Sequence, residues 1–305
     1  MFSFAPADAA VLVPVPHVPN ATATMVFGIN DSNVIVGSAV SKNDRLERGF
    51  YGPLGGPYTS FDAGPGGTRA LAISNDGHVV GYANSQDGET DTQPVFERWP
   101  GGKTRTVMDA GSPVYGAASG IANATNAFVG DFWDWGDYAI SPFRGHHGQW
   151  SRDIRLSGFQ FSAATGINST GVIVGFGATD HVHGFVLNGN RKSIALVDFP
   201  GNKTDATELH GINDNGQAAG QWFDIYNTPH GFVLDLATNT FTEIKVRGAT
   251  HVQAWGINSA GAIAVTSDKG SFIWCAVDSS CPSSGAAIRV DAPVHRGTGK
   301  PIRLQ

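Results

Sequence analysis

Six copies of one short pattern recur along the chain, and their regular spacing limits its possible folds more than any other feature. Each copy has a triplet related to Gly-Ile-Asn, then a turn, then an aliphatic run that usually ends in glycine. The triplets begin at residues 28, 72, 120, 166, 211 and 256, so neighbouring copies are 44 to 48 residues apart. A fixed period of this length is typical of identical supersecondary units arranged in one array.

Each copy is predicted to contain four short β-strands, which we call a, b, c and d. In the clearest copy they cover residues 209–213, 217–223, 230–235 and 241–246. These segments are alternating or continuously apolar and are bounded by turn residues such as Asn215 and Gly216, which favours strands over helices. Further d strands are expected at 58–62, 104–109, 154–156 and 194–198. Four antiparallel strands in a repeat of about 45 residues are typical of a β-propeller blade.

We therefore predict an all-β fold, a six-bladed β-propeller that forms a single domain over residues 1–305. The blades are expected to start near residues 22, 66, 114, 160, 205 and 250. A strand at 9–16 resembles the segment 286–291, which makes seven candidates for strand d but only six sets of a, b and c. One terminus is therefore expected to complete a blade begun by the other, which would remove exposed sheet edges. Which terminal strand is the inner one stays open.

Composition and missing motifs exclude several functions. The net charge is −6 and no basic cluster is present, so nucleic acid is not an expected partner. No apolar run of 18 residues occurs, so a membrane partner is not expected either. The chain has no Gly-x-Ser-x-Gly elbow, Walker loop or Rossmann fingerprint, and we expect no cofactor. The pairs His146–His147 and His181–His183 match no recognised zinc pattern, so no metal is expected.

Cys275 and Cys281 are the only cysteines. They could close a small loop as a disulfide in an oxidising compartment, or they could be two unrelated buried thiols. We expect the disulfide. Five Asn-x-Ser/Thr sequons add weak support for a secreted protein, which would need a leader absent from this sequence, and a cytoplasmic location stays open. Nothing in the sequence indicates the oligomeric state.

The segment 211–217, Gly-Ile-Asn-Asp-Asn-Gly-Gln, followed by 230–234, His-Gly-Phe-Val-Leu, resembles the extracellular HAF-type repeats. The resemblance covers essentially the whole chain at the level of the blade. It implies a β-propeller and specifies no activity. The third copy departs most, because Asn123-Ala124-Thr125 replaces the glycine-containing turn.

The b-to-c and d-to-a connections share one face of a propeller, and here they are the longer ones, rich in histidine and aromatic residues. Binding sites usually occupy loops on a rigid scaffold, and the mouth of a ring is a natural pocket. Aromatic clusters on this face are either fillers between blades or a stacking wall for a sugar or a flat organic ligand. The residues are Trp133, Trp135, Tyr138, Trp222 and Tyr226.

One residue precedes each triplet on the innermost strand and should approach the axis or the blade core. These residues are Phe27, Leu71, Ser119, Thr165, His210 and Trp255. His210 and Trp255 either pack in the core or line a channel pocket together with Arg69 and His251. His183 and His230 stand at the head of strand c, where they either bond to the backbone or contribute to binding.

Three functions fit these observations. The first is a small-molecule pocket. It could belong to a cofactor- and metal-independent cyclase, such as a hetero-Diels–Alderase-like enzyme of secondary metabolism. Such an enzyme needs shape, aromatic walls and one or two hydrogen-bond donors. Some fungal cyclases on propeller-like scaffolds are similar in type, without a residue match. The second is a carbohydrate-active protein, a lectin or a polysaccharide lyase. The third is a non-catalytic interaction module.

The first function is favoured because the expected mouth is aromatic and has few Lys or Arg residues for a polyanionic polysaccharide. Its catalytic candidates are His251, His210, Arg69 and Tyr226. Its candidate binding residues are Trp133, Trp135, Tyr138, Trp222, Trp255, His183 and His230. The expected partner is a small-molecule or carbohydrate ligand.

Overall fold

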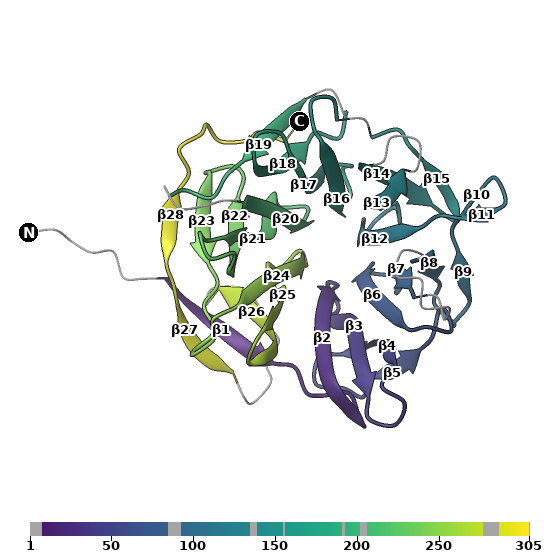
Figure 1. Cartoon of the computed structure of the whole chain (residues 1–305). Coiled ribbons are helices and arrows are strands. Elements are labelled where there is room, and N and C mark those ends of the chain that lie inside the picture. The colour runs from purple at the N-terminus through teal and green to yellow at the C-terminus, as the bar shows by residue number, and fades with distance from the viewer. Residues whose placement is uncertain are drawn as a thin grey trace, which may run out of the picture.

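The computed structural model describes residues 8–84, 93–134, 139–154, 156–190, 193–201, 206–276 and 287–304. Within these ranges the regular secondary structure consists only of β-strands, so they contain no helix able to cross a membrane. The strands form six blades of four antiparallel strands around a central axis (Figure 1). The predicted six-bladed β-propeller is therefore confirmed.

Strands a, b, c and d follow one another from the axis outward in each blade (Figure 1). Blade 1 contains β2 (Ala21–Ile29), β3 (Val34–Ser41), β4 (Glu47–Pro53) and β5 (Thr59–Phe61). Blade 2 contains β6 (Thr68–Ile73), β7 (Val79–Ala83), β8 (Val95–Arg98) and β9 (Thr104–Thr106), and is followed by a small hairpin of β10 (Met108–Asp109) and β11 (Ser112–Pro113). Blade 3 contains β12 (Gly116–Ile121), β13 (Phe128–Asp134), β14 (Ala139–His146) and β15 (Gln149–Ser151).

Blade 4 contains β16 (Phe161–Ile167), β17 (Ile173–Ala178), β18 (Val182–Leu187) and β19 (Ile194–Val197). Blade 5 contains β20 (Ala206–Ile212), β21 (Gln217–Phe223), β22 (Pro229–Asp235) and β23 (Thr240–Glu243). Blade 6 begins with β24 (Val252–Ile257), β25 (Ile263–Ser267) and β26 (Gly270–Ala276).

The two termini close the ring at blade 6, as predicted. Strand β1 (Asp8–Pro14) pairs with β26, where Leu12 lies opposite Trp274. Strand β27 (Ile288–Ala292) pairs with the other edge of β1, where Val290 lies opposite Ala10. The N-terminal strand is thus the inner one and the C-terminal strand covers its edge. A last strand, β28 (Val294–Arg296), continues along the outside of blade 5 and pairs with β23 (Figure 1).

One expected strand is wrong. The fourth strand of blade 3 is β15 (Gln149–Ser151), not residues 154–156. His147 and Gly148 adopt positive φ angles of 49° and 76°, so the chain reverses immediately after β14. Ile154 instead has a buried side chain in the core cluster between blades 3 and 4.

The asparagine of the triplet explains why the motif recurs, because it closes one turn and joins two blades. The Asn213 side-chain oxygen accepts the backbone N–H groups of Asn215 and Gln217 at 3.1 and 3.0 Å. Its amide nitrogen donates to the backbone carbonyl of Asn258 in the next blade at 2.9 Å. Three further triplet asparagines make the same inter-blade bond, namely Asn30 to Ser74, Asn168 to Asn213, and Asn258 to Asn30.

The triplet glycine is required by the close approach of neighbouring blades at the axis. A Cβ atom on Gly166 would lie 2.9 Å from the carbonyl oxygen of His210 and 3.0 Å from the Cα atom of Gly211. These are backbone atoms and cannot move aside cheaply. A larger residue here would push blades 4 and 5 apart.

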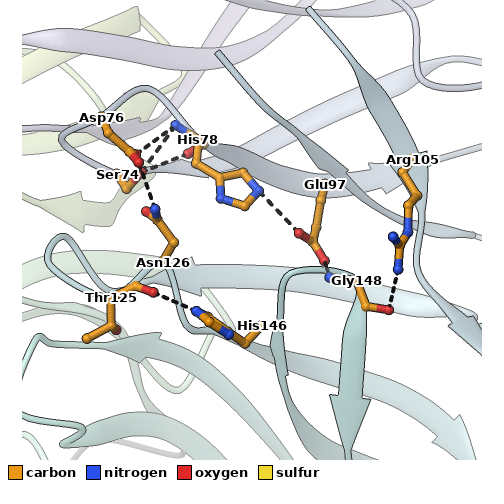
Figure 2. A network of polar contacts seen from close by, with 9 residues as sticks. All are labelled: Ser74, Asp76, His78, Glu97, Arg105, Thr125, Asn126, His146 and Gly148. Atoms are coloured by element: carbon orange, nitrogen blue, oxygen red, sulfur yellow. Dashed lines mark hydrogen bonds and ion pairs between the residues drawn. The ribbon is translucent and has the colours of Figure 1, made fainter.

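Blades 2 and 3 have Ser74 and Ala122 where the other blades have asparagine, and the blade 2–3 interface uses a different network (Figure 2). Asn126 donates its amide N–H to Asp76 at 2.7 Å. Fully buried Glu97 accepts the backbone N–H of Gly148, whose carbonyl accepts a hydrogen bond from Arg105 at 2.8 Å. These contacts join the two blades where the asparagine bond is missing.

His78 completes this network from within blade 2 (Figure 2). Its Nε2 atom lies 3.2 Å from a Glu97 carboxylate oxygen, at ion-pair distance but without hydrogen-bond alignment. Both side chains are almost fully buried, and the His78 ring stacks on Trp99 with 5.1 Å between centroids. The interface therefore depends on the buried Glu97 carboxyl group, which has neighbours on both blades.

Candidate functional site

A β-bulge interrupts every innermost strand just before the triplet. The register shifts between Leu209 and Gly211 in blade 5, for example, and leaves His210 unpaired. A bulge adds one residue to a strand and re-aims its side chain, and bulges are frequent beside active sites. The bulged residues of blades 1 to 5 are Phe27, Leu71, Ser119, Thr165 and His210, and the shift in blade 6 contains Trp255 and Gly256.

These bulge residues line one axial cavity of about 240 Å³. Four more side chains complete its wall: Glu208 from a first strand, and Asp131, Phe176 and Gln221 from second strands. Because the bulge residues precede the triplet, the cavity lies on the side of the glycines that faces the b-to-c and d-to-a connections. At the glycines the axial space falls to about 50 Å³, which is room for a few water molecules.

Aromatic side chains hold one side of the cavity in a fixed arrangement. The Trp255 ring meets Phe27 edge to face, with centroids 5.3 Å apart, and stacks on His210 at 4.5 Å. The Trp255 indole N–H donates to the Thr266 hydroxyl at 2.8 Å, so its polar atom is satisfied outside the cavity wall. Such rings offer apolar faces for stacking with a flat ligand.

His210, Glu208 and Gln221 form a hydrogen-bonded group at the blade 5 wall. The His210 Nδ1 atom lies 3.0 Å from the Ala254 carbonyl oxygen, so Nδ1 must carry a proton. The Nε2 atom lies 3.1 Å from a Glu208 carboxylate oxygen, which also accepts the Gln221 amide N–H at 2.6 Å. A hydrogen bond between Nε2 and Glu208 requires one more proton between them. The geometry therefore fixes the atoms between which His210 and Glu208 share a proton.

Asp131 is a second proton-handling group on the same cavity. Burial raises the pKa of its carboxyl from 3.8 to about 7. The cavity lining contains no Lys or Arg that would stabilise the carboxylate, and its only basic residue is His210. A carboxyl group with a pKa near neutrality is suited to act as a general acid or base, and such shifts concentrate at functional sites.

Arg69 lies behind the cavity wall. It forms a bidentate pair with Glu47, with N–O distances of 2.9 and 3.0 Å, and its guanidinium lies 5.7 Å from the centroid of the Phe27 ring. Burial raises the pKa of neighbouring Tyr82. The positive charge of Arg69 lowers that pKa, and the negative charges of Glu47 and Asp131 raise it, so the net shift is upward. The Arg69 charge is thus balanced by Glu47, and Arg69 does not line the cavity.

All six residues that precede the triplets line the cavity, and they include His210 and Trp255 from the predicted catalytic and binding set. His251, Tyr226 and Trp222 of that set lie away from it. His251 is exposed, with Nδ1 2.8 Å from the Thr250 hydroxyl. Tyr226 is 81% exposed on the b-to-c connection of blade 5. Trp222 is held between Phe199 and His230, with ring centroids 4.9 and 4.3 Å away, and is used in packing.

Trp133 and His183, two further predicted residues within the described ranges, also lie away from the cavity. Trp133 is 39% exposed near the end of β13, and Trp135 and Tyr138 lie outside the described residues. His183 is buried between Asp180 and Asp198. Cys275 is buried in β26, but Cys281 lies outside the described residues, so the disulfide stays a prediction.

Sequence reasoning missed Asp131, Glu208, Phe176 and Gln221 as cavity residues. Asp131 lies within β13, which extends as a strand through Asp134. A signal was available, because Asp131, Phe176 and Gln221 each follow the glycine of strand b in their own repeat. Aligning the repeats at that glycine places all three on the same face of their strands.

No family model matches the chain, and no curated protein sequence does. Solved structures resemble it at low sequence identity. A TolB-type protein of Agrobacterium tumefaciens has 10% identity and a TM-score of 0.53, and the match covers 75% of this chain and 85% of that one. A prolyl endopeptidase structure has 15% identity and a TM-score of 0.50 over 90% of this chain and 44% of the other. These likenesses show the β-propeller fold. The lectin of Aleuria aurantia, in complex with alpha-methyl-L-fucoside, has 11% identity and a TM-score of 0.48, and the match covers 96% of this chain and 100% of that one. Fold alone does not specify activity.

Proposed function

We propose that the axial cavity is the active site of an enzyme that binds a small, ring-containing, largely apolar molecule and transfers a proton with its own side chains. This is the chemistry of a cyclase or an isomerase that needs neither cofactor nor metal. The observation that carries the proposal is the raised pKa of Asp131 in a cavity that also contains the His210–Glu208 pair.

The size of the cavity supports a small substrate. An apolar cavity of roughly 150 Å³ takes up benzene. The axial cavity, at about 240 Å³, has room for a substituted ring or a small fused pair of rings. Phe27, Phe176 and Trp255 would hold the flat faces of such a molecule, and Ser119 offers a hydroxyl group to its polar atoms. The Thr165 hydroxyl donates to the Leu209 carbonyl, so it could only accept a hydrogen bond from the ligand.

The two proton-handling groups support acid–base chemistry. Two titratable groups in different environments can divide the roles of acid and base. Asp131 has no cationic partner on the cavity wall, whereas the Glu208 carboxylate accepts hydrogen bonds from His210 and Gln221. Asp131 is therefore the better candidate to exchange a proton near neutral pH, and Glu208 holds His210 and Gln221 in place. Positioning a substrate between them would lower the barrier to proton transfer.

A filled-cavity variant tests this proposal. Leu71→Trp places a large ring in the cavity without touching Asp131, Glu208 or His210, and Tyr226→Ala removes an exposed ring on the loop-rich face as a matched control. Small aromatic and cyclic carbonyl probes such as indole, 2-naphthol and cyclohexenone are screened by thermal shift and calorimetry. We expect binding by the parent and Tyr226→Ala proteins and at least a tenfold loss in a folded Leu71→Trp protein.

Turnover of a bound probe class should then fall at least tenfold in Asp131→Asn, with folding checked by circular dichroism. Binding that survives in Leu71→Trp would place the ligand outside the axial cavity. Undiminished turnover in Asp131→Asn would contradict proton transfer by this carboxyl group.

A carbohydrate-binding function is the alternative, and one observation favours it. A surface cleft of about 570 Å³ between blades 3 and 4 is lined by Arg144, His146, Gln149 and Trp150, which together could bind an acidic or neutral sugar. Uronate and neutral oligosaccharides should be included in the same screen. Binding that is lost in Arg144→Ala but kept in Leu71→Trp would favour this alternative. Failure of both ligand classes would favour an interaction module.

We also propose, from the sequence resemblance, that the six units are HAF-type repeats of one secreted domain, with a Cys275–Cys281 disulfide. Mass measurement after thiol alkylation, with and without reduction, tests the disulfide directly. Alkylation of both cysteines in the folded, unreduced protein would contradict it.

A further inference from the structure

Two histidines and two aspartates converge at the b-to-c turn of blade 4, away from the axial cavity. His181 lies in the turn just before β18, and His183 is the second residue of that strand. Their ring centroids are only 3.8 Å apart. Asp180 lies in the turn before them, and Asp198 follows β19, the strand that pairs with β18.

The distances in this group suit a common ligand. Asp180 lies 2.9 Å from His183 Nε2 and 3.3 Å from His181 Nδ1. One atom from each of these three side chains lies within 4.8 Å of the others. Donor atoms of a tetrahedral Zn²⁺ site are about 3.3 Å apart, given metal–ligand distances near 2 Å. Asp180 is 79% exposed and His181 is 44% exposed, so both can make the small movement needed.

The group is held in position by its surroundings. A backbone hydrogen bond from Thr179 to the His181 carbonyl closes the short turn at 3.1 Å. The Thr179 hydroxyl donates to Asp180 at 2.8 Å. His183 is buried, and its Nδ1 atom lies 2.7 Å from Asp198. A histidine that gives one ring nitrogen to a carboxylate presents the other nitrogen in a fixed direction, which is the usual arrangement around a metal-bound histidine.

We propose that Asp180, His181 and His183 bind one divalent transition-metal ion, with Asp198 as the residue that positions His183. Two imidazoles and one carboxylate favour Zn²⁺, Co²⁺, Ni²⁺ or Cu²⁺ over Mg²⁺ or Ca²⁺, which prefer oxygen ligands. Three protein ligands leave at least one coordination position for water or another ligand. Because the ligands are part of one short turn next to the end of strand d, the ion would also stabilise this edge of blade 4.

Metal titration of the tag-free, full-length protein after EDTA treatment tests the proposal. Zn²⁺ binding is measured by calorimetry, and Co²⁺ binding by its visible absorption. The variants are His181→Ala, Asp180→Asn and Asp198→Asn. The matched controls are His17→Ala, which removes an exposed histidine elsewhere, and His146→Ala, which breaks the other closely spaced histidine pair.

We expect one ion per chain in the parent protein and in both controls, with a Zn²⁺-dependent rise in Tm. Affinity should fall at least tenfold in His181→Ala and Asp180→Asn, and about 10- to 100-fold in Asp198→Asn, as for outer-shell carboxylates in general. Absence of one-to-one binding in the parent, undiminished affinity in His181→Ala, or loss of binding in His146→Ala overturns the site. Unchanged affinity in Asp198→Asn overturns the positioning role of that residue. None of these readouts depends on the axial cavity.

Discussion

Asp131→Asn should stabilise the protein at neutral and alkaline pH and leave its stability almost unchanged in acid. Burial raises the pKa of Asp131 from 3.8 to about 7, so the folded protein holds a proton on this group that the unfolded chain releases above pH 4. Stability therefore falls as the pH rises from about 4 to about 7 and is level above that range. A shift of this size corresponds to about 4 kcal/mol at most, because each pKa unit is worth 1.36 kcal/mol. Water in the cavity reduces this figure.

The assay is urea unfolding of the parent and the variant at a series of pH values from 4 to 9. The difference in free energy of unfolding should grow with pH across the titration range and then become constant. Asp291→Asn, which changes an exposed carboxyl on β27, is the control and should show no such rise. A difference that is independent of pH, or one that shrinks as the pH rises, would refute the assignment of a destabilised carboxylate to the cavity.

Two further predictions concern the contacts between blades. Glu97→Ala should lower the free energy of unfolding by about 3–5 kcal/mol, because it leaves His78 and the Gly148 N–H buried without their partner. Glu97→Gln keeps a side-chain oxygen, so its free energy of unfolding should fall by less. Equal losses in both variants would show that the oxygen kept in Glu97→Gln contributes nothing to stability. Gly166→Ala should lower the free energy of unfolding by about 1–3 kcal/mol, because the added Cβ meets the backbone of blade 5. Ala72→Gly, at the equivalent position of blade 2, should change the free energy of unfolding by no more than about 1 kcal/mol. Thermal unfolding compares the two variants directly, and a neutral Gly166→Ala would mean that the blades separate easily at the axis.

The architecture could be predicted because the triplet asparagine bonds both within its own blade and to the next blade. Asn213 must cap its own turn and also reach the next blade, so its spacing along the sequence reports the spacing of the blades. The order of the two terminal strands was not predicted, because both segments look like strands. In β1, Leu12 and Val13 are almost fully buried, whereas Ile288 in β27 is 44% exposed, and this contrast in apolar content decides which strand lies inside.

The candidate site was predicted only in part. The position of His210 and Trp255 before their triplets was sufficient to place them near the axis, and the bulges explain why their side chains line the cavity. The roles of aromatic residues on the connections could not be read in the same way. Trp222 is enclosed by Phe199 and His230, whereas Tyr226, four residues later, is solvent-exposed. The neighbours that decide between these outcomes come from other strands and connections, namely Phe199 before blade 5 and His230 on β22.

The position of β1 between β26 and β27 has a consequence for synthesis of the protein. Both partners of β1 are made more than 250 residues after it. It must wait without a partner until blade 6 has been synthesised. Pairing over such a sequence distance is entropically costly and slow. Blades 1 to 5 can assemble as they emerge, but the ring becomes a closed cooperative unit only when β1 joins β26 and β27.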